Sequence, residues 1–442
     1  MKRLLIIFVL LSQTLFGQEN KEVTIEEKLI GLQTIYQEMN YNFAYFGEDR
    51  TEWDSLYKVS ITKVLKTKSL LEYYSILSDL VNYFHEGHTT VSRPDSLSRY
   101  YGSLDISVFY YDDNFYVKAL GDDFVGKIKL GAKIVDIDGQ SSMHYFNNSI
   151  FTKSCTAPQS AKSYLTEKPF RFFRGMVQDS VRITLINPKG DTVKIVSNRK
   201  RETDNLKYVQ SLPSLFSDTV FSYVIKKNIA YVKIGSFLSD KASSEFKKIV
   251  SKLKKCKGIV FDLRGAIGGN SDFALAIVEH FTRDSLLDVW WGQSKINNSS
   301  YRAYAMYPNM KTHNDYYADY GKLSHFEGGK VSFKNLSEGE LSHLPIVVLC
   351  NGSTASSSEM FIVLLKQLKK ISVIGEPSYG SITMPLILSL PYGGSLYIGV
   401  QRALDEKGML YQFIEPDILY TPTWEDRMKG KDVARKMALE SF

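Results

Sequence analysis

Five hydroxyl side chains occupy six consecutive positions, 353–358, within the segment "NGSTASSSEM". An apolar run, "LPIVVLC", precedes this segment, and a second, "MFIVLL", follows it. This order predicts a strand, a tight turn and a helix, with the hydroxyls at the turn. The free N–H groups and positive dipole end of a helix N-terminus suit a developing oxyanion, so a serine here is a candidate nucleophile.

A helix cap is the alternative interpretation of the same residues. Ser356 and Glu359 fit the S-x-x-E capping box, in which the serine caps the helix and the glutamate bonds back to it. That pattern implies no chemistry. Ser353 and Thr354 could serve as caps instead, and they would then leave the Ser356 hydroxyl free to react.

A glycine-rich turn gives further support for a site. The segment "DLRGAIGGN" follows the apolar run "KGIVF", and Gly265, Gly268 and Gly269 allow a backbone that turns N–H groups toward a ligand. Active sites of α/β sheets lie beyond the carboxyl ends of the strands. Two turns of this kind in one sheet therefore favour an active site over a cap alone.

Two histidines, His85 and His88, stand three residues apart in "FHEGHTT". The zinc-protease motif needs a spacing of four on one helix face, and Gly87 would break the helix, so we expect neither a metal site nor a cofactor. Loop histidines with satisfied hydrogen bonds are one interpretation. A general base is the other, since imidazole ionises near neutral pH.

Three stretches of the chain, each with a different pattern of apolar residues, must position these side chains. From about 22 to 84, apolar residues recur at three- and four-residue spacing, which predicts a small helical cap. From about 100 to 200 the pattern indicates strands, with hairpin turns near Asp112 and Pro188. From about 205 to 425, strands that are apolar on both faces alternate with helices, which predicts a covered parallel sheet.

The first residues have the pattern of a secretory signal peptide. Lys2 and Arg3 precede the apolar "LLIIFVLLSQTLF", and small Gly17 precedes a polar segment, so residues 1–17 are predicted to be removed. We expect an exported protein, periplasmic or extracellular, with no membrane span after signal removal. The formal charge of +7 falls to +5 without the two basic residues, and the remaining basic residues are scattered, which disfavours nucleic-acid binding.

Four segments taken together resemble one family. "IVFDLRGAIGGN", "VVLCNGSTASSSEMF", "VIGEPSYG" and "IEPDI" are similar, in order and spacing, to the tail-specific or C-terminal-processing proteases of peptidase family S41. "NYFHEGHTTV" resembles the D-G-H-T element of the tricorn-core-like branch, and "GKIKLGAKIVDIDGQSS" resembles part of a PDZ domain. The resemblance implies an α/β fold with a ClpP/crotonase-like catalytic domain. It divides the chain into a helical region (18–98), a PDZ-like β-rich domain (99–202, with an insertion at about 145–178) and the catalytic domain (203–442).

The resemblance also implies a role for individual residues. The nucleophile falls on Ser356, the general base on His88 and its orienting carboxylate on Glu415 of "IEPDI". Asp417, after Pro416, is the structural alternative at that turn.

Supporting roles are implied in the same way. The oxyanion donors fall on the N–H groups of Ser357 and of Gly268 or Gly269, and Glu359 falls on the motif glutamate. Ser381 follows "GEPSYG" where the lysine-dyad branch carries its base.

These assignments predict an exported serine peptidase that acts on peptide or protein substrates. The absent lysine favours a second hypothesis, a non-catalytic ligand- or peptide-binding protein on the same scaffold, since retinoid-binding relatives show that this fold need not hydrolyse peptides. A third hypothesis, a crotonase-like acyl-CoA enzyme, is opposed by the export signal and the PDZ-like segment. The sequence predicts neither the natural substrate nor the oligomeric state.

Overall fold

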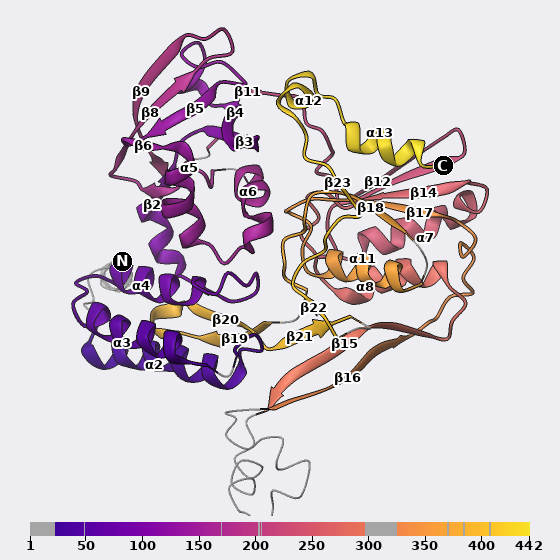
Figure 1. Ribbon diagram of the computed structural model, residues 1–442, viewed down its shortest axis with the longest axis horizontal. Coiled ribbons are helices and arrows are strands. Elements are labelled where there is room, and N and C mark those ends of the chain that lie inside the picture. Colours follow the sequence, from indigo (N-terminus) through magenta and orange to yellow (C-terminus); the bar gives the residue numbers. More distant parts are fainter. Residues whose placement is uncertain are drawn as a thin grey trace, which may run out of the picture.

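The computed structural model describes residues 23–47, 49–168, 170–201, 204, 206–296, 325–368, 371–382, 385–405 and 408–442. The predicted signal peptide lies outside these residues. An N-terminal helical region, a β-rich region and a C-terminal α/β region follow one another along the chain (Figure 1). Within the described ranges, no helix is long and apolar enough to cross a membrane.

Three helices make up most of the N-terminal region: α2 (Ile25–Asn42), α3 (Thr51–Leu65) and α4 (Leu70–Asn82). Thr24 and Glu27 form a capping box at the start of α2, and Ser69 caps α4. The core of this region also takes in Leu396 and Ile398 from the C-terminal part of the chain. They belong to the strand β20 (Ser395–Gly399), which pairs with β19 (Pro385–Ser389) and with β1 (Thr90–Ser92).

The β-rich region has its own buried core, built around a twisted antiparallel sheet. Its main path runs β11-β4-β5-β8-β9, with β3 paired to β4 and β6 paired to β5. A smaller sheet has the order β10-β2-β7. The strands are β2 (Tyr101–Ser103), β3 (Ile106–Tyr111), β4 (Asn114–Leu120), β5 (Lys133–Ile137), β6 (Gln140–Ser141), β7 (Gly175–Met176), β8 (Ser180–Ile186), β9 (Thr192–Asn198), β10 (Lys200–Arg201) and β11 (Gln210–Ser211).

Short helical pieces fill the segment between β6 and β8, where the sequence predicts an insertion. They are α5 (Ser142–Tyr145), the π-turn η3 (Phe146–Ile150), the 3-10 turn η4 (Phe151–Lys153) and α6 (Pro158–Glu167). The helix α6 lies between the β-rich sheet and the α/β region (Figure 1). It begins with proline at its first position, which costs no hydrogen bond there.

The C-terminal region is built on a six-stranded sheet with the order β12-β13-β14-β17-β18-β23. Its strands are β12 (Phe221–Lys226), β13 (Ile229–Ile234), β14 (Gly258–Asp262), β17 (Ile346–Cys350), β18 (Ser372–Gly375) and β23 (Ile418–Leu419), and all but β12 run parallel. One face packs against α7 (Lys241–Leu253), α8 (Ser271–Val278) and α11 (Ser357–Leu368). The other face packs against α13 (Val433–Glu440), which follows α12 (Trp424–Lys429).

A second, smaller sheet connects this region to the helical region. It has the order β16-β15-β21-β22, with strands β15 (Leu286–Ile296), β16 (His325–Lys334), β21 (Gln401–Leu404) and β22 (Leu410–Tyr411). Figure 1 shows the β15–β16 hairpin running toward the helices. Lys295 of β15 donates a hydrogen bond to the Asn40 carbonyl of α2, so the two regions are in direct contact.

The predicted elements are confirmed where their pattern is local. The helical region, both hairpins and the two strand–turn–helix units all form as predicted. Asp112 and Asp113 adopt positive φ values of 46° and 52°, which is the two-residue turn that matches the twist of the paired strands. The similarity of 99–202 to a PDZ domain stays a prediction.

Candidate active site

The turn between β17 and α11 holds Ser356 in an unusual backbone conformation. Its φ is 55°, in the left-handed region that costs a residue with a side chain roughly 1 kcal/mol. The strand β17 is buried throughout, and α11 starts at the next residue. Strained residues of this kind cluster at functional sites. The turn therefore presents one serine at the carboxyl end of the sheet.

The other hydroxyls of this segment are already engaged or buried. Thr354 Oγ1 donates to the Leu263 carbonyl at 2.9 Å, and Ser357 Oγ donates to the Gly269 carbonyl at 2.6 Å. The Ser358 hydroxyl is buried. Thr354 thus links loops rather than capping α11, contrary to the cap considered for it. In the part of the chain that the structure describes, Ser356 Oγ makes no hydrogen bond, so this hydroxyl alone is available to a ligand.

The glycine-rich turn after β14 lies directly against Ser356. A Cβ atom added at Gly268 would lie 2.8 Å from Ser356 Cβ and 3.0 Å from the Ser357 nitrogen, and its φ is +83°. Only glycine fits this approach. Gly269, by contrast, presses against the Phe237 backbone, and its carbonyl is bonded to Ser357. Among the described residues, the N–H groups of Gly268 and Ser357 have no hydrogen-bond acceptor.

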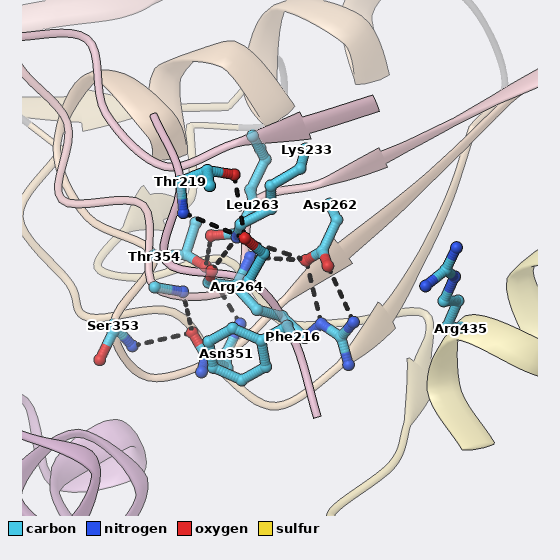
Figure 2. A network of polar contacts seen from close by, with 12 residues as sticks. Phe216, Thr219, Lys233, Asp262, Leu263, Arg264, Asn351, Ser353, Thr354 and Arg435 are labelled. Atoms are coloured by element: carbon cyan, nitrogen blue, oxygen red, sulfur yellow. Dashed lines mark hydrogen bonds and ion pairs between the residues drawn. The ribbon is translucent and has the colours of Figure 1, made fainter. Parts of the chain in front are cut away.

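Short polar contacts fasten the two turns to each other. Asn351 Oδ1 accepts from the Gly265 nitrogen at 2.9 Å, and Ala355 N donates to the Ala266 carbonyl at 2.9 Å. Figure 2 shows Asn351 and Thr354 reaching from one turn to the other. These main-chain and side-chain bonds together fix the distance between Ser356 and the Gly268 turn.

A buried ionic network holds the chain just before the glycine-rich turn, and Figure 2 shows Lys233, Asp262 and Arg264 of this network. Arg264 makes bonds of 2.8–2.9 Å to both oxygens of Asp262 and a second bidentate pair at 2.8 Å to Asp432, at the start of α13. Lys233 Nζ donates to the Arg264 carbonyl. Arg264 and Lys233 lower the pKa of the Asp262 carboxyl, although its burial acts in the opposite direction. The bonds of Arg264 to Asp262 and Asp432 therefore fix the chain between the end of β14 and Gly265.

Glu359 connects the hydroxyl turn to the "GEPSYG" turn. Its buried carboxylate accepts from the Ser356 nitrogen at 2.8 Å, from the Gly380 and Ser381 nitrogens at 2.9 Å each, and from Ser378 Oγ at 2.5 Å. Burial raises the pKa of Glu359, and these hydrogen bonds oppose the rise. The sequence predicts a capping box of two bonds between Ser356 and Glu359. The bond from the Ser356 nitrogen to the Glu359 carboxylate is one of them.

The histidine turn packs onto the same place. Gly87 N donates to the Gly380 carbonyl at 3.2 Å, and a Cβ atom at Gly87 would lie only 2.9 Å from Ser381 Cβ. The next strand, β1, pairs with β20, so Thr90 lies opposite Tyr397. The turn that carries His88 therefore packs on Gly380, and Glu359 accepts hydrogen bonds from both the Gly380 and the Ser356 nitrogens. His85 points elsewhere, since it stacks on Phe151 and bonds the Ser154 carbonyl.

Glu86 is a residue of this site that the sequence did not single out. Its carboxylate accepts from the His88 nitrogen at 3.2 Å and from Thr89 Oγ1, and Thr89 Oγ1 accepts from the Gly399 nitrogen at 2.9 Å. Glu86 therefore fixes the backbone of the histidine turn against β20. Burial raises the pKa of Glu86 from 4.5 to about 7, with a smaller contribution from Glu359.

This raised pKa predicts how Glu86 affects stability. The folded chain keeps a proton that the unfolded chain releases above pH 4.5, so the stabilisation is complete below that pH and is lost as the pH rises through about 7. The loss is on the order of 2 kcal/mol. Thermal midpoints of Glu86→Gln should therefore fall less than those of the unmodified chain between pH 5 and pH 8. Parallel curves for the two proteins would show that Glu86 is not protonated in the folded state.

The C-terminal half of the chain matches a known family. Residues 228–420 match the model of peptidase family S41. This part of the chain belongs to peptidase family S41. The chain is 24% identical over 254 residues to a carboxy-terminal-processing protease of Bartonella bacilliformis, covering 56% of this chain and 51% of that protein. It is also 24% identical over 241 residues to the carboxy-terminal processing protease CtpA of Bacillus subtilis, with 53% and 43% covered.

The chain therefore spans about half the length of the curated relatives it matches. Its fold is similar over a longer range to the crystal structure of mature CPAF, with a TM-score of 0.70 at 13% identity. That match covers 94% of this chain and 96% of CPAF. The predicted α/β fold with helical and β-rich regions is thus confirmed.

The residue that directly follows the "GEPSYG" turn is Ser381, not a lysine. Ser381 is buried and donates to Glu359 at 3.3 Å. Lys366 pairs with Asp417 at 3.2 Å, and Asp417 also accepts from the Val373 nitrogen, which is the structural role considered for it. Lys369, Lys370 and Lys407 lie outside the described residues.

The remaining predicted residue, Glu415, is exposed. Within the described ranges it makes no hydrogen bond. A side chain at position 87 would collide with the Gly380 carbonyl, since an added Cβ atom at Gly87 would lie 2.6 Å from it.

Proposed function

We propose that this chain is an exported serine peptidase that cleaves peptide bonds with Ser356 as nucleophile and His88 as general base. The observation that carries the proposal is the conformation of Ser356. It is strained, half-exposed and has an unengaged hydroxyl in the described part of the chain, and it faces a turn that only glycine can form.

The first chemical step follows from this arrangement. Ser356 Oγ attacks the peptide carbonyl carbon while His88 accepts the hydroxyl proton. The N–H groups of Gly268 and Ser357 donate to the oxyanion. We favour Gly268 over Gly269 for this role because Gly268 lies against Ser356, whereas Gly269 lies against the Phe237 backbone. Glu359 holds the Ser356 nitrogen and so fixes the turn during the reaction.

The second step completes the cycle. His88 returns its proton to the leaving amine, and the peptide carbonyl stays bound to Ser356 as an ester. Water then attacks the ester with His88 again as base, which releases the acid and restores the serine. Glu415 is the proposed orienting carboxylate. It makes no hydrogen bond within the described ranges, so its bond to His88 would form when the substrate binds.

His88 is supported as the base by what surrounds position 381. A lysine is absent there, Ser381 is bonded to Glu359, and Gly87 packs against both Gly380 and Ser381. The histidine turn therefore packs on residues that Glu359 connects to the Ser356 nitrogen, and this packing supports His88 as the base. The competing function, a binding protein without chemistry, shares this scaffold and differs in one measurable property, bond cleavage.

Digestion of an unfolded protein tests the proposal. The purified chain is incubated with alkylated casein, and new peptide termini are identified by mass spectrometry. We expect termini that are absent when Ser356→Ala replaces the unmodified chain. A folded, unmodified chain that binds peptides but produces no new termini would support the binding protein instead.

A further inference from the structure

The last residue of α6, Glu167, reaches the chain segment that leads to Ser356. Its Oε2 atom accepts a hydrogen bond from Asn351 Nδ2 at 2.6 Å. Asn351 directly follows β17, whereas Glu167 lies outside the residues 228–420 that match family S41. We propose that Glu167 is a positioning residue that holds Ser356 and the Gly268 turn in place through Asn351, an inference that rests on the proposed peptidase function and adds a side chain of the β-rich region to its site.

The backbone contacts of Asn351 fix the orientation of its amide. Oδ1 accepts from the Gly265 nitrogen at 2.9 Å and from the Ser353 nitrogen at 3.2 Å, and Figure 2 shows the bond from Ser353. Only the oxygen of an amide accepts such bonds, so the NH2 group must face Glu167. Gly265 and Ser353 stand three residues before Gly268 and Ser356. One buried amide therefore holds both turns of the proposed site.

Arg427 of α12 holds the other oxygen of Glu167. Its Nη2 atom pairs with Glu167 Oε1 at 3.1 Å, and both side chains are less than a tenth exposed. Hydrogen bonds to a carboxylate from an arginine and an amide are charge-assisted and strong. Since Arg427 and Asn351 each bind one oxygen, the Glu167 carboxylate is fixed from two separate elements and gives Asn351 a defined partner.

The rest of α6 keeps Glu167 at this distance. A Cβ atom added at Gly352 would lie only 2.9 Å from the Ser160 carbonyl, so the helix rests directly on the residue after Asn351. Ser160 Oγ also donates to the Tyr379 carbonyl at 3.1 Å. Ser160 and Glu167 are seven residues apart, which is about two helical turns, so both project from one face of α6. That face lies on the strand ends that carry the proposed site.

A reversal of donor and acceptor tests the proposal. Glu167→Gln loses one bond, because its NH2 group must face either Arg427 or Asn351, which are both donors. Asn351→Asp places two carboxylates against each other. In the double variant, the introduced amide accepts from Arg427 and donates to the introduced carboxylate, whose second oxygen still accepts from Gly265 and Ser353. Every bond then has a partner again.

Peptide hydrolysis and hydrogen exchange are measured for the full chain and the three variants at pH 8.5. We expect each single variant to lower kcat at least 10-fold with KM within about 2-fold, because the substrate still binds while the reacting groups are misplaced. The Gly265 and Ser353 amides, resolved by mass spectrometry with fragmentation, should exchange at least 10-fold faster, whereas the amides of β14 should not. The double variant should return kcat and both exchange rates to within about 3-fold of the unmodified chain.

Two further variants serve as controls. Lys162→Gln removes a charge from the same helix, where Lys162 pairs with Asp113 of the β-rich region at 3.2 Å, and it should change neither kcat nor exchange. Glu167→Asp replaces Glu167→Gln if the latter does not fold. It keeps the charge beside Arg427 but is one methylene group too short to hold both partners, and we expect about 3-fold lower kcat and about 3-fold faster exchange.

Either of two results would refute the proposal: Gly265 and Ser353 amides that exchange at the unmodified rate in Glu167→Gln, or a double variant no better than Asn351→Asp alone. Peptide cleavage by the unmodified chain together with unchanged exchange in the variants would refute the role of Glu167 alone. An unmodified chain that cleaves no peptide would refute the peptidase proposal, and the exchange rates would still decide whether Glu167 holds the two turns.

Discussion

Ser356→Ala should lower kcat/KM for peptide hydrolysis by about 10⁴-fold or more, because it removes the only hydroxyl in this turn that can attack a carbonyl. The neighbouring hydroxyls cannot replace it. Ser357 Oγ is bonded to the Gly269 carbonyl, and the Ser358 hydroxyl is buried in α11. Initial rates on a peptide found in the casein digest would measure the loss.

Two further variants distinguish loss of chemistry from loss of structure. Ser358→Ala removes an adjacent hydroxyl that has no hydrogen-bond partner among the described residues, and it should keep nearly full activity. Ser356→Gly should be inactive, yet its thermal midpoint should be about 2 °C higher, because glycine adopts the φ of 55° without strain. A Ser356→Gly protein that retains activity would contradict the assignment.

His88→Ala should cost about as much activity as Ser356→Ala, since the two residues act as one unit and their effects are not additive. In the unmodified chain, kcat/KM should rise with pH through one ionisation near ~6 to 7, as expected for an imidazole base. The profile is best measured in Glu86→Gln as well, because the pKa of Glu86 is raised to about 7 and its ionisation falls in the same range.

His85→Asn provides the matched control for the second prediction. His85 has a φ of 47°, which asparagine tolerates, and its contacts are with Phe151 and the Ser154 carbonyl. We expect this variant to keep most of its activity and the same pH profile. Equal losses in His85→Asn and His88→Ala would show that the turn as a whole, rather than one imidazole, is required.

The sequence predicted those parts of the fold that rest on local patterns. The strand–turn–helix unit around Ser356 was evident because β17 and α11 have apolar sequences on either side of a polar turn. The Gly268 turn was predictable because glycine marks a backbone that other residues cannot adopt. The proximity of these two turns also followed, since parallel strands bring their carboxyl ends to one edge.

Features that depend on distant segments were not predictable in this way. Strands β19 and β20 lie in the chain between the motifs "VIGEPSYG" and "IEPDI", yet they complete the core of the N-terminal helices. No local pattern encodes that packing. Glu86 was not singled out from the sequence, because its role depends on contacts with Thr89 and β20.

Covalent labelling tests the central claim most directly. The unmodified chain is treated with a fluorophosphonate, digested, and the modified residue is located by mass spectrometry. Our account predicts a single adduct on Ser356, slowed at least tenfold in His88→Ala because the hydroxyl then lacks its base. An adduct on Ser357 or Ser358, or a folded chain that does not react at all, would contradict the account.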